Sequence, residues 1–324
     1  MSDTVSKASV NSGRSASIDP ATLMRIKNLQ IRAKHVVDGF HNGLHRSPLH
    51  GFSVEFSEYR PYVVGDDPRS IDWKLFARSD RYYLKKFEDE TNRRCHLIVD
   101  QSRSMGYGSL EYTKLDYART LAATLAYYLT LQRDAVGMMT FEADVTSVVP
   151  ARYRTGQLRR MLMLLDRPPE GTETDLKKPL AHLAEIAKHR GLMLIISDFL
   201  VPVETLQQPL AYLAARRHEV ILIRVVDPAE LTLAFKQPTV IRDMESGREM
   251  YIDPKTAAES YRTKFQKHAE ELAALAGKLG MMQVTIRTDE PLELALWELL
   301  HNRENLFSRG RVRRSPSGNV GGRA

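Results

Sequence analysis

Three polar side chains stand at alternate positions in the stretch LIVDQSRSMG, which runs from Leu97 to Gly106. Its apolar start predicts a buried strand, and Asp100, Ser102 and Ser104 follow at the point where that strand ends. One carboxylate beside two hydroxyl groups is compatible with a serine nucleophile, a phosphoryl-accepting aspartate or a metal site. A structural interpretation is also open, because serines often cap turns.

Further oxygen donors stand at two other points of the chain. Asp198 follows the apolar run LMLIIS, and the loop GTET, which precedes a predicted helix, supplies Thr172 and Thr174. None of these donors is a cysteine or a histidine. Hard oxygen ligands suit Mg²⁺ or Mn²⁺ and argue against zinc or copper, and the sequence does not distinguish between the first two ions.

Enzyme classes that use similar residues fit this sequence poorly. The serines lack the G-x-S-x-G pattern of a nucleophile elbow, and the chain contains no P-loop motif. His96 stands at the opposite end of its strand from Asp100, so no general base is positioned at the site. We therefore expect no enzymatic activity. A magnesium-dependent hydrolase or phosphatase that uses the same strand-end residues is the alternative.

From Cys95 onward, the sequence predicts alternating strands and helices, and these elements would position the polar residues. The short apolar runs CHLIVD, LMLIIS and EVILIRVV are separated by helical patterns, which predicts parallel strands covered on both faces. The runs AVGMMTF and VTSVVP are close enough to pair as a hairpin. The expected fold class is α/β, with a doubly wound, mostly parallel sheet of Rossmann type. In such sheets ligands bind outside the carboxyl ends of the strands.

Changes in composition along the chain indicate how it is organised. Leu23, Ile26, Leu29 and Ala33 follow a helical spacing, which predicts one helix from Ala21 to about Asp38. The predicted parts are a disordered N-terminus over 1–18, an N-terminal helix and β-rich module over 19–93, a main domain over 94–305 with a hairpin insertion near 232–253, and a basic disordered tail over 306–324.

The composition also limits the function classes. The formal net charge is +7, but residues 308–324 carry five arginines and no acidic residue, so most of the excess lies in the tail. That tail lacks interleaved aromatic residues, and we do not expect nucleic-acid binding. A single cysteine, Cys95, excludes an internal disulfide framework. No apolar run suggests a membrane span or an export signal, so we expect a cytoplasmic protein.

The strand-end residues together resemble the von Willebrand factor A domain. Asp-x-Ser-x-Ser after the first strand, a threonine loop and an aspartate that ends the next buried strand occur in the order of that family's metal-ion-dependent adhesion site. The resemblance covers 94–303 and implies that five residues hold the ion: Asp100, Ser102, Ser104, Thr172 and Asp198. Thr174 is the alternative to Thr172.

The segment upstream of the main domain resembles a second signature. The stretch GDDPRSIDWKLFAR, with EFSEYRPY before it and FEDE after it, is similar to the bacterial family called domain of unknown function fifty-eight. Members of that family carry a von Willebrand factor A-like domain and are typically encoded beside MoxR-type AAA+ ATPases. A structural role in turns and local ion pairs accounts for this segment equally well.

The two resemblances imply a function in protein–protein interaction. They imply a metal-dependent adaptor, or a chaperone-like cofactor, that works with a MoxR-type AAA+ ATPase on a client protein, and the client would supply an acidic residue to the metal. The candidate partner-binding residues are Arg103, Arg69, Asp72, Trp73 and Arg78. Neither the client, the pathway nor the oligomeric state follows from the sequence.

Overall fold

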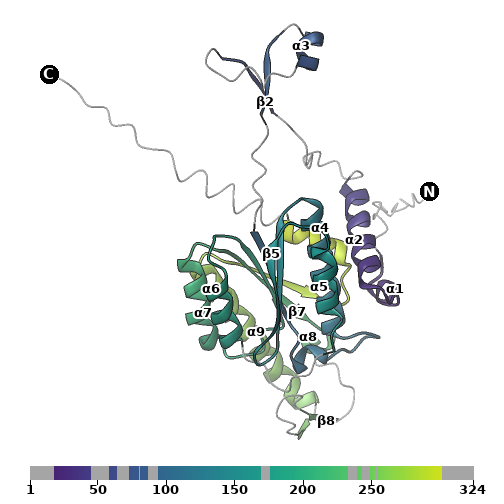
Figure 1. Ribbon diagram of the computed structural model, residues 1–324. Helices are drawn as coiled ribbons and strands as arrows, with labels where there is room; N and C mark the ends of the chain where they lie inside the picture. Colours follow the sequence, from purple (N-terminus) through teal and green to yellow (C-terminus); the bar gives the residue numbers. More distant parts are fainter. Residues whose placement is uncertain are drawn as a thin grey trace, which may run out of the picture.

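A six-stranded sheet forms the centre of the computed structural model (Figure 1). The strands lie in the order β10-β7-β6-β3-β4-β5, and all neighbours are parallel except β4 and β5. Their bounds are Arg94–Asp100 (β3), Ala135–Phe141 (β4), Val145–Arg152 (β5), Leu192–Ser197 (β6), Glu219–Val226 (β7) and Met282–Arg287 (β10). The structure describes residues 18–44, 58–63, 73–79, 81–86, 94–168, 176–232, 239–242, 249–252 and 254–300.

The central strands are apolar because both of their faces are covered. All six residues of β6 are buried, and every residue of β7 after Glu219 is buried too. In β3, Leu97 and Val99 point into one hydrophobic core while Ile98 points into the other. Successive side chains of a strand alternate between the faces of a sheet, so a strand buried on both faces has a continuous apolar sequence.

Two layers of helices cover the sheet, as Figure 1 shows. One layer contains α2 (Leu29–Leu44), α4 (Lys114–Leu131), α5 (Gln157–Leu165) and a helix over 292–300. The other contains α6 (Lys177–Ile186), α7 (Val203–Ala215) and α9 (Pro254–Lys278). The predicted doubly wound, mostly parallel α/β fold is confirmed, and it is the arrangement that the resemblance to von Willebrand factor A domains implied.

The strand order reverses beside β3. From β3 the chain continues to β4 and β5 on one side, and the later strands β6, β7 and β10 lie on the other side. The carboxyl ends of β3 and β6 therefore meet where the connections leave in opposite directions. In open α/β sheets this is the place where a crevice forms and ligands bind.

The N-terminal helices pack into the core of the main domain. The chain forms α1 (Pro20–Met24) and α2, separated by residues 25–28, where the sequence predicted a single helix. That prediction was wrong because Asn28 begins a new helix: its side chain accepts a hydrogen bond from the N–H of Ile31 at 3.1 Å. Val36 and Phe40 of α2 belong to the same hydrophobic core as α4.

Two small two-stranded sheets are separate from the central sheet. β1 (Glu58–Pro61) pairs antiparallel with β2 (Tyr83–Lys86), and α3 (Trp73–Ser79) lies between them in the sequence. Phe76 stacks on Tyr82 with ring centroids 4.4 Å apart. β8 (Thr239–Arg242) pairs antiparallel with β9 (Glu249–Ile252), within the expected insertion. In the described residues, no helix has the length and apolar character needed to cross a bilayer.

Candidate functional site

Asp100 lies fully buried at the carboxyl end of β3. Its carboxylate accepts a hydrogen bond from the N–H of Ser102 at 2.9 Å and another from the hydroxyl of Ser197 at 2.6 Å. The short 3₁₀ helix η2 (Arg103–Gly106) follows directly and turns the chain, so that the hydroxyl oxygens of Ser102 and Ser104 are 3.2 Å apart. One carboxylate and two adjacent hydroxyl groups therefore meet at the strand end, as the sequence spacing indicated.

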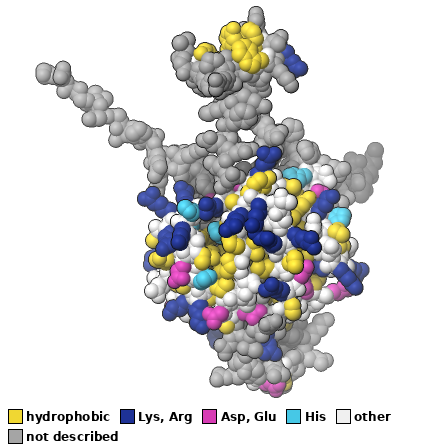
Figure 2. All heavy atoms as spheres, in the orientation of Figure 1, with side chains coloured by type: hydrophobic (Ala, Val, Ile, Leu, Met, Phe, Trp, Pro, Cys, Tyr) yellow, Lys and Arg dark blue, Asp and Glu magenta, His cyan; other side chains and the backbone are white. Residues whose placement is uncertain are grey.

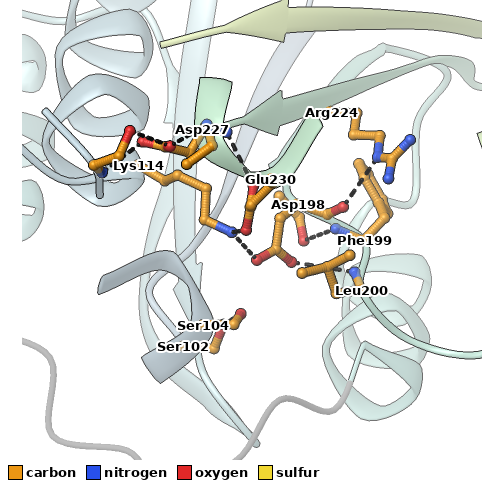
Figure 3. A network of polar contacts seen from close by, with 12 residues as sticks. Ser102, Ser104, Lys114, Asp198, Phe199, Leu200, Arg224, Asp227 and Glu230 are labelled. Carbon is orange, nitrogen blue, oxygen red and sulfur yellow. Dashed lines mark hydrogen bonds and ion pairs between the residues drawn. The ribbon is translucent and has the colours of Figure 1, made fainter. Parts of the chain in front are cut away.

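Asp198 extends the site from the neighbouring strand. It follows β6, which pairs directly with β3. One of its carboxylate oxygens accepts a hydrogen bond from the N–H of Leu200 at 3.2 Å. The other lies 2.8 Å from the ammonium group of Lys114. That ammonium is also 2.6 Å from Glu230, so a buried lysine joins two carboxylates beside the predicted metal site (Figure 3).

The start of α4 explains why a lysine reaches this position. Lys114 is the first residue of the helix, and it is fully buried. Thr113 and Asp116 form a capping box, in which each side chain accepts a hydrogen bond from the other residue's N–H. A Cβ on Gly108 would lie 2.3 Å from the carbonyl oxygen of Tyr112, so only glycine permits the close approach of the loop that leads into the helix.

Burial and charge raise the pKa of Asp100 together, but they act against each other on Lys114. Burial, followed by the negative charge of Asp198, raises the pKa of Asp100 from 3.8 to about 7, against the hydrogen bonds from Ser102 and Ser197. Burial lowers the pKa of Lys114, but the charges of Asp198 and Glu230 together raise it by more. Lys114 therefore stays charged at neutral pH, whereas Asp100 is protonated part of the time because burial disfavours its carboxylate form.

The residues present fit a small divalent cation. Adjacent ligands of an octahedral Mg²⁺ ion, with bonds of about 2.0–2.1 Å, lie about 3 Å apart. The hydroxyl oxygens of Ser102 and Ser104 have a similar separation of 3.2 Å. Asp100 would supply a carboxylate, whose negative charge a bound cation would stabilise against the cost of burial. Among the described residues no cluster of three His, Cys, Asp or Glu side chains forms a metal site, so an ion here requires the serine hydroxyls.

The structure brings four predicted ligands to one edge of the sheet, and these are Asp100, Ser102, Ser104 and Asp198. Thr172 and its alternative Thr174 lie outside the described residues, and so do Arg69 and Asp72 of the predicted partner-binding set. Arg103 is exposed between the two serines. Trp73 and Arg78 are exposed on α3. Their metal and partner roles stay predictions.

Sequence reasoning missed the polar network behind the site. Asp227, at the end of β7, accepts hydrogen bonds from the N–H and hydroxyl of Ser109 at 2.9 and 2.5 Å. The N–H of Asp227 donates to Glu230 at 2.9 Å, which holds Glu230 toward Lys114 (Figure 3). Only the order of the strands reveals this network, because it places the first turn of α4 and the residues after β7 at the same edge as Asp100.

A second buried cation connects the site with α9. Arg224 of β7 is 1% exposed, and its Nε donates to the carbonyl oxygen of Asp198 at 3.4 Å. Its guanidinium lies 4.5 Å from the ring centroid of Phe265 on α9. Burial lowers the pKa of this arginine, and the charges of Asp198 and Glu230 oppose the shift. Arg224 therefore holds the backbone of Asp198, while Lys114 holds its carboxylate.

Comparison with known proteins identifies relatives over most of the chain. The uncharacterized protein Rv1480 of Mycobacterium tuberculosis is 31% identical over 278 residues, which cover 84% of this chain and 86% of that protein. BatB from Bacteroides thetaiotaomicron, a conserved hypothetical protein of known structure, is 16% identical, with a TM-score of 0.45 over 65% of this chain and 98% of BatB. An aerotolerance-related membrane protein from Bacteroides fragilis is 14% identical, with a TM-score of 0.47 over 65% of this chain and 98% of that protein.

A family described as "Protein of unknown function DUF58" matches residues 58–274, which is more than half of the chain. This range begins at the first residue of β1 and ends within α9. It therefore includes the strand-end site, from Asp100 on β3 to Glu230 after β7. The chain belongs to the DUF58 family.

Proposed function

We propose that this protein is a metal-dependent, protein-binding adaptor of the cytoplasm that works with a MoxR-type AAA+ ATPase on the assembly or activation of a client complex. The observation that supports this most directly is the pair of hydroxyl oxygens 3.2 Å apart beside the buried carboxylate of Asp100. Such a donor set suits binding of Mg²⁺ or Mn²⁺ better than covalent catalysis.

The charges of the ligands favour recognition of an acidic partner. Serine hydroxyls are neutral ligands, and Lys114 already neutralises much of the charge of Asp198. When bound, the ion would supply net positive charge and a coordination position for a carboxylate of the client. Arg103 is exposed between the two serines and adds a further cation at the rim. The ATPase partnership rests on the sequence resemblance to a family whose members are typically encoded beside MoxR-type AAA+ ATPases.

Two measurements on the full chain test the proposal. The first is calorimetric titration of the protein with Mg²⁺ and with Mn²⁺, for the wild type and for Asp100→Ala. The second is affinity capture from an extract of the native cells, with Mg²⁺ or with chelator, followed by mass spectrometry. We expect Asp100→Ala to lose metal binding and with it the capture of an AAA+ ATPase or a client.

Asp166→Asn is a matched control, because Asp166 is an exposed aspartate at the end of α5. It should bind metal and partners as the wild type does. Capture that is equal with Asp100→Ala and wild type, or unaffected by chelator, would contradict the proposal. Steady hydrolysis of a phosphate ester that disappears in Asp100→Ala would instead favour the hydrolase or phosphatase alternative.

A further inference from the structure

A cavity lies near the amino end of β3, away from the metal site at the carboxyl end of that strand. Its volume is about 470 Å³, and it lies between the β4–β5 pair and the end of α6. Arg94 at its rim begins β3, whereas Asp100 ends that strand, and six residues of a strand span about 20 Å. Its apolar lining is contributed by Met138, Met139, Val148, Leu183, Ile186 and Ala187.

An irregularity in the β4–β5 pair shapes this cavity. The register shifts between Val136 and Met138, so that two residues of β5 face Gly137. A Cβ on Gly137 would lie 2.5 Å from the backbone nitrogen of Ala151, so glycine is required there. The buried amide of Gln157 donates to the carbonyl oxygens of Val136 at 2.8 Å and Pro150 at 2.7 Å. The wall of the cavity is therefore rigidly held.

The charged side chains at the rim of the cavity are all positive. Arg94, Arg152 and Lys188 line it together with His189, and no acidic residue does. In the described part of the chain, no salt bridge neutralises these three cations. His96, on the floor, is uncharged at neutral pH, because burial, then His218 and Arg94, lower its pKa to about 4. Figure 2 shows Lys and Arg side chains around hydrophobic ones on the face over β5.

We infer that this cavity is a second docking site, and that it binds an acidic peptide segment of a partner protein through a hydrophobic side chain flanked by carboxylates. The apolar floor would take the side chain, and the rim formed by Arg94, Arg152 and Lys188 would pair with the carboxylates. The peptide would lie over the sheet rather than extend it, because Pro150 has no N–H to offer at this edge strand.

Fluorescence anisotropy with the full chain tests this inference. The probe is the fluorescein-labelled peptide EEELFEEE, and the comparison peptides are QQQLFQQQ and EEEGGEEE. We expect saturable binding of the first peptide and at least tenfold weaker binding of the other two. Arg152→Glu and Val148→Asp should each weaken binding about tenfold or more. Both positions are exposed on β5, so these variants should fold, which circular dichroism and thermal melting would check.

Matched variants distinguish binding in this cavity from general charge attraction and from binding at the metal site. Arg159→Glu reverses an exposed arginine on α5 that does not line the cavity, and it should bind the probe as the wild type does. Equal losses in Arg159→Glu and Arg152→Glu would overturn the inference, since the overall charge of the protein would then account for binding. Loss of binding in Asp100→Ala would overturn it too, because the probe would then occupy the metal site.

The chain also contains an acidic segment of its own, Glu88–Asp89–Glu90, outside the described residues. A triple variant, Glu88→Gln with Asp89→Asn and Glu90→Gln, should bind the probe with unchanged affinity. Clearly tighter binding by this variant would identify the chain's own segment as the occupant and would overturn the assignment to a partner. The proposed metal function can fail without affecting any of these results, because every probe measurement can be made in chelator.

Discussion

Replacement of Lys114 by methionine removes a buried charge while keeping a side chain of similar length. In the native structure the Lys114 and Asp198 side chains are 1% and 2% exposed, and their charged atoms are 2.8 Å apart. Removal of one partner of a buried ion pair typically costs about 3–5 kcal/mol, because the other charge stays buried without compensation. Glu230 is 13% exposed and can regain some water, so Asp198 accounts for most of the loss.

Urea unfolding at pH 7.5 in chelator measures this loss. We expect the midpoint of Lys114→Met to fall at an unchanged m-value, by an amount that corresponds to about 3–5 kcal/mol. Added Mg²⁺ should restore part of the stability if an ion binds beside Asp198, because a second cation then compensates its carboxylate. The restoration should be absent when Asp100→Ala is combined with Lys114→Met.

The exposed pair of Lys178 and Asp144 provides the control. Its atoms are 3.3 Å apart, but the side chains are 63% and 71% exposed, so Lys178→Met should cost about 0–1 kcal/mol. A loss for Lys114→Met that is no larger than this would refute the reasoning. It would mean that water or a neighbouring group compensates Asp198 and that the lysine is not the counter-charge of the site.

Three more changes probe individual parts of the structure. Asp100→Asn should reduce the pH dependence of stability in the absence of metal. Because its pKa is raised to about 7, native Asp100 holds a proton that the unfolded chain has lost, so the stability of the wild type falls between about pH 4 and 7. Urea midpoints at pH 5 and pH 7.5 measure this difference. Gln157→Ala should cost about 2 kcal/mol in urea unfolding, since the buried carbonyl group of Val136 and the partly buried one of Pro150 lose their donor. Thr113→Ala should lower stability by about 1 kcal/mol through loss of the helix cap, by the same measurement.

Each of these has a matched comparison. An unchanged pH dependence in Asp100→Asn would show that the aspartate is not the group that titrates. Gln207→Ala, at an exposed position of α7, should leave the free energy of unfolding unchanged. A loss equal to that of Gln157→Ala would show that the two hydrogen bonds of Gln157 are not the cause. Thr113→Ser keeps the hydroxyl and should retain most of the wild-type stability. A loss as large as that of Thr113→Ala would argue against the cap.

The sheet could be predicted because its strands obey a simple rule. A parallel strand between two helical layers is largely apolar, and the runs Leu192–Ile196 of β6 and Val220–Ile223 of β7 show this. The ends of such strands are equally visible, since polar residues such as Asp100 and Asp198 interrupt the apolar runs. In a doubly wound sheet the carboxyl ends of neighbouring parallel strands lie side by side. The sequence alone therefore predicted that four of the five proposed ligands lie close together.

The network around Lys114 could not be predicted in the same way. A lysine at a helix start normally points to solvent, and nothing in its local sequence indicates full burial. Its position depends on two distant elements, because Asp198 is 84 residues away and Glu230 is 116 residues away. Only the order of the strands shows that the carboxylates that follow β6 and β7 lie beside the start of α4.

This fixed cation changes what a metal ion could contribute. Lys114 compensates Asp198 in the absence of an ion, so the part of the site that a metal would neutralise is chiefly Asp100. A structural zinc site, by contrast, leaves all its ligands without compensation when the metal is absent, and such domains then unfold. Here the domain should stay folded in chelator, and Mg²⁺ at 100 times its dissociation constant should add only about 2.7 kcal/mol of stability. An ion that is dispensable for folding can be gained and lost with a binding partner, which is what metal-bridged recognition requires.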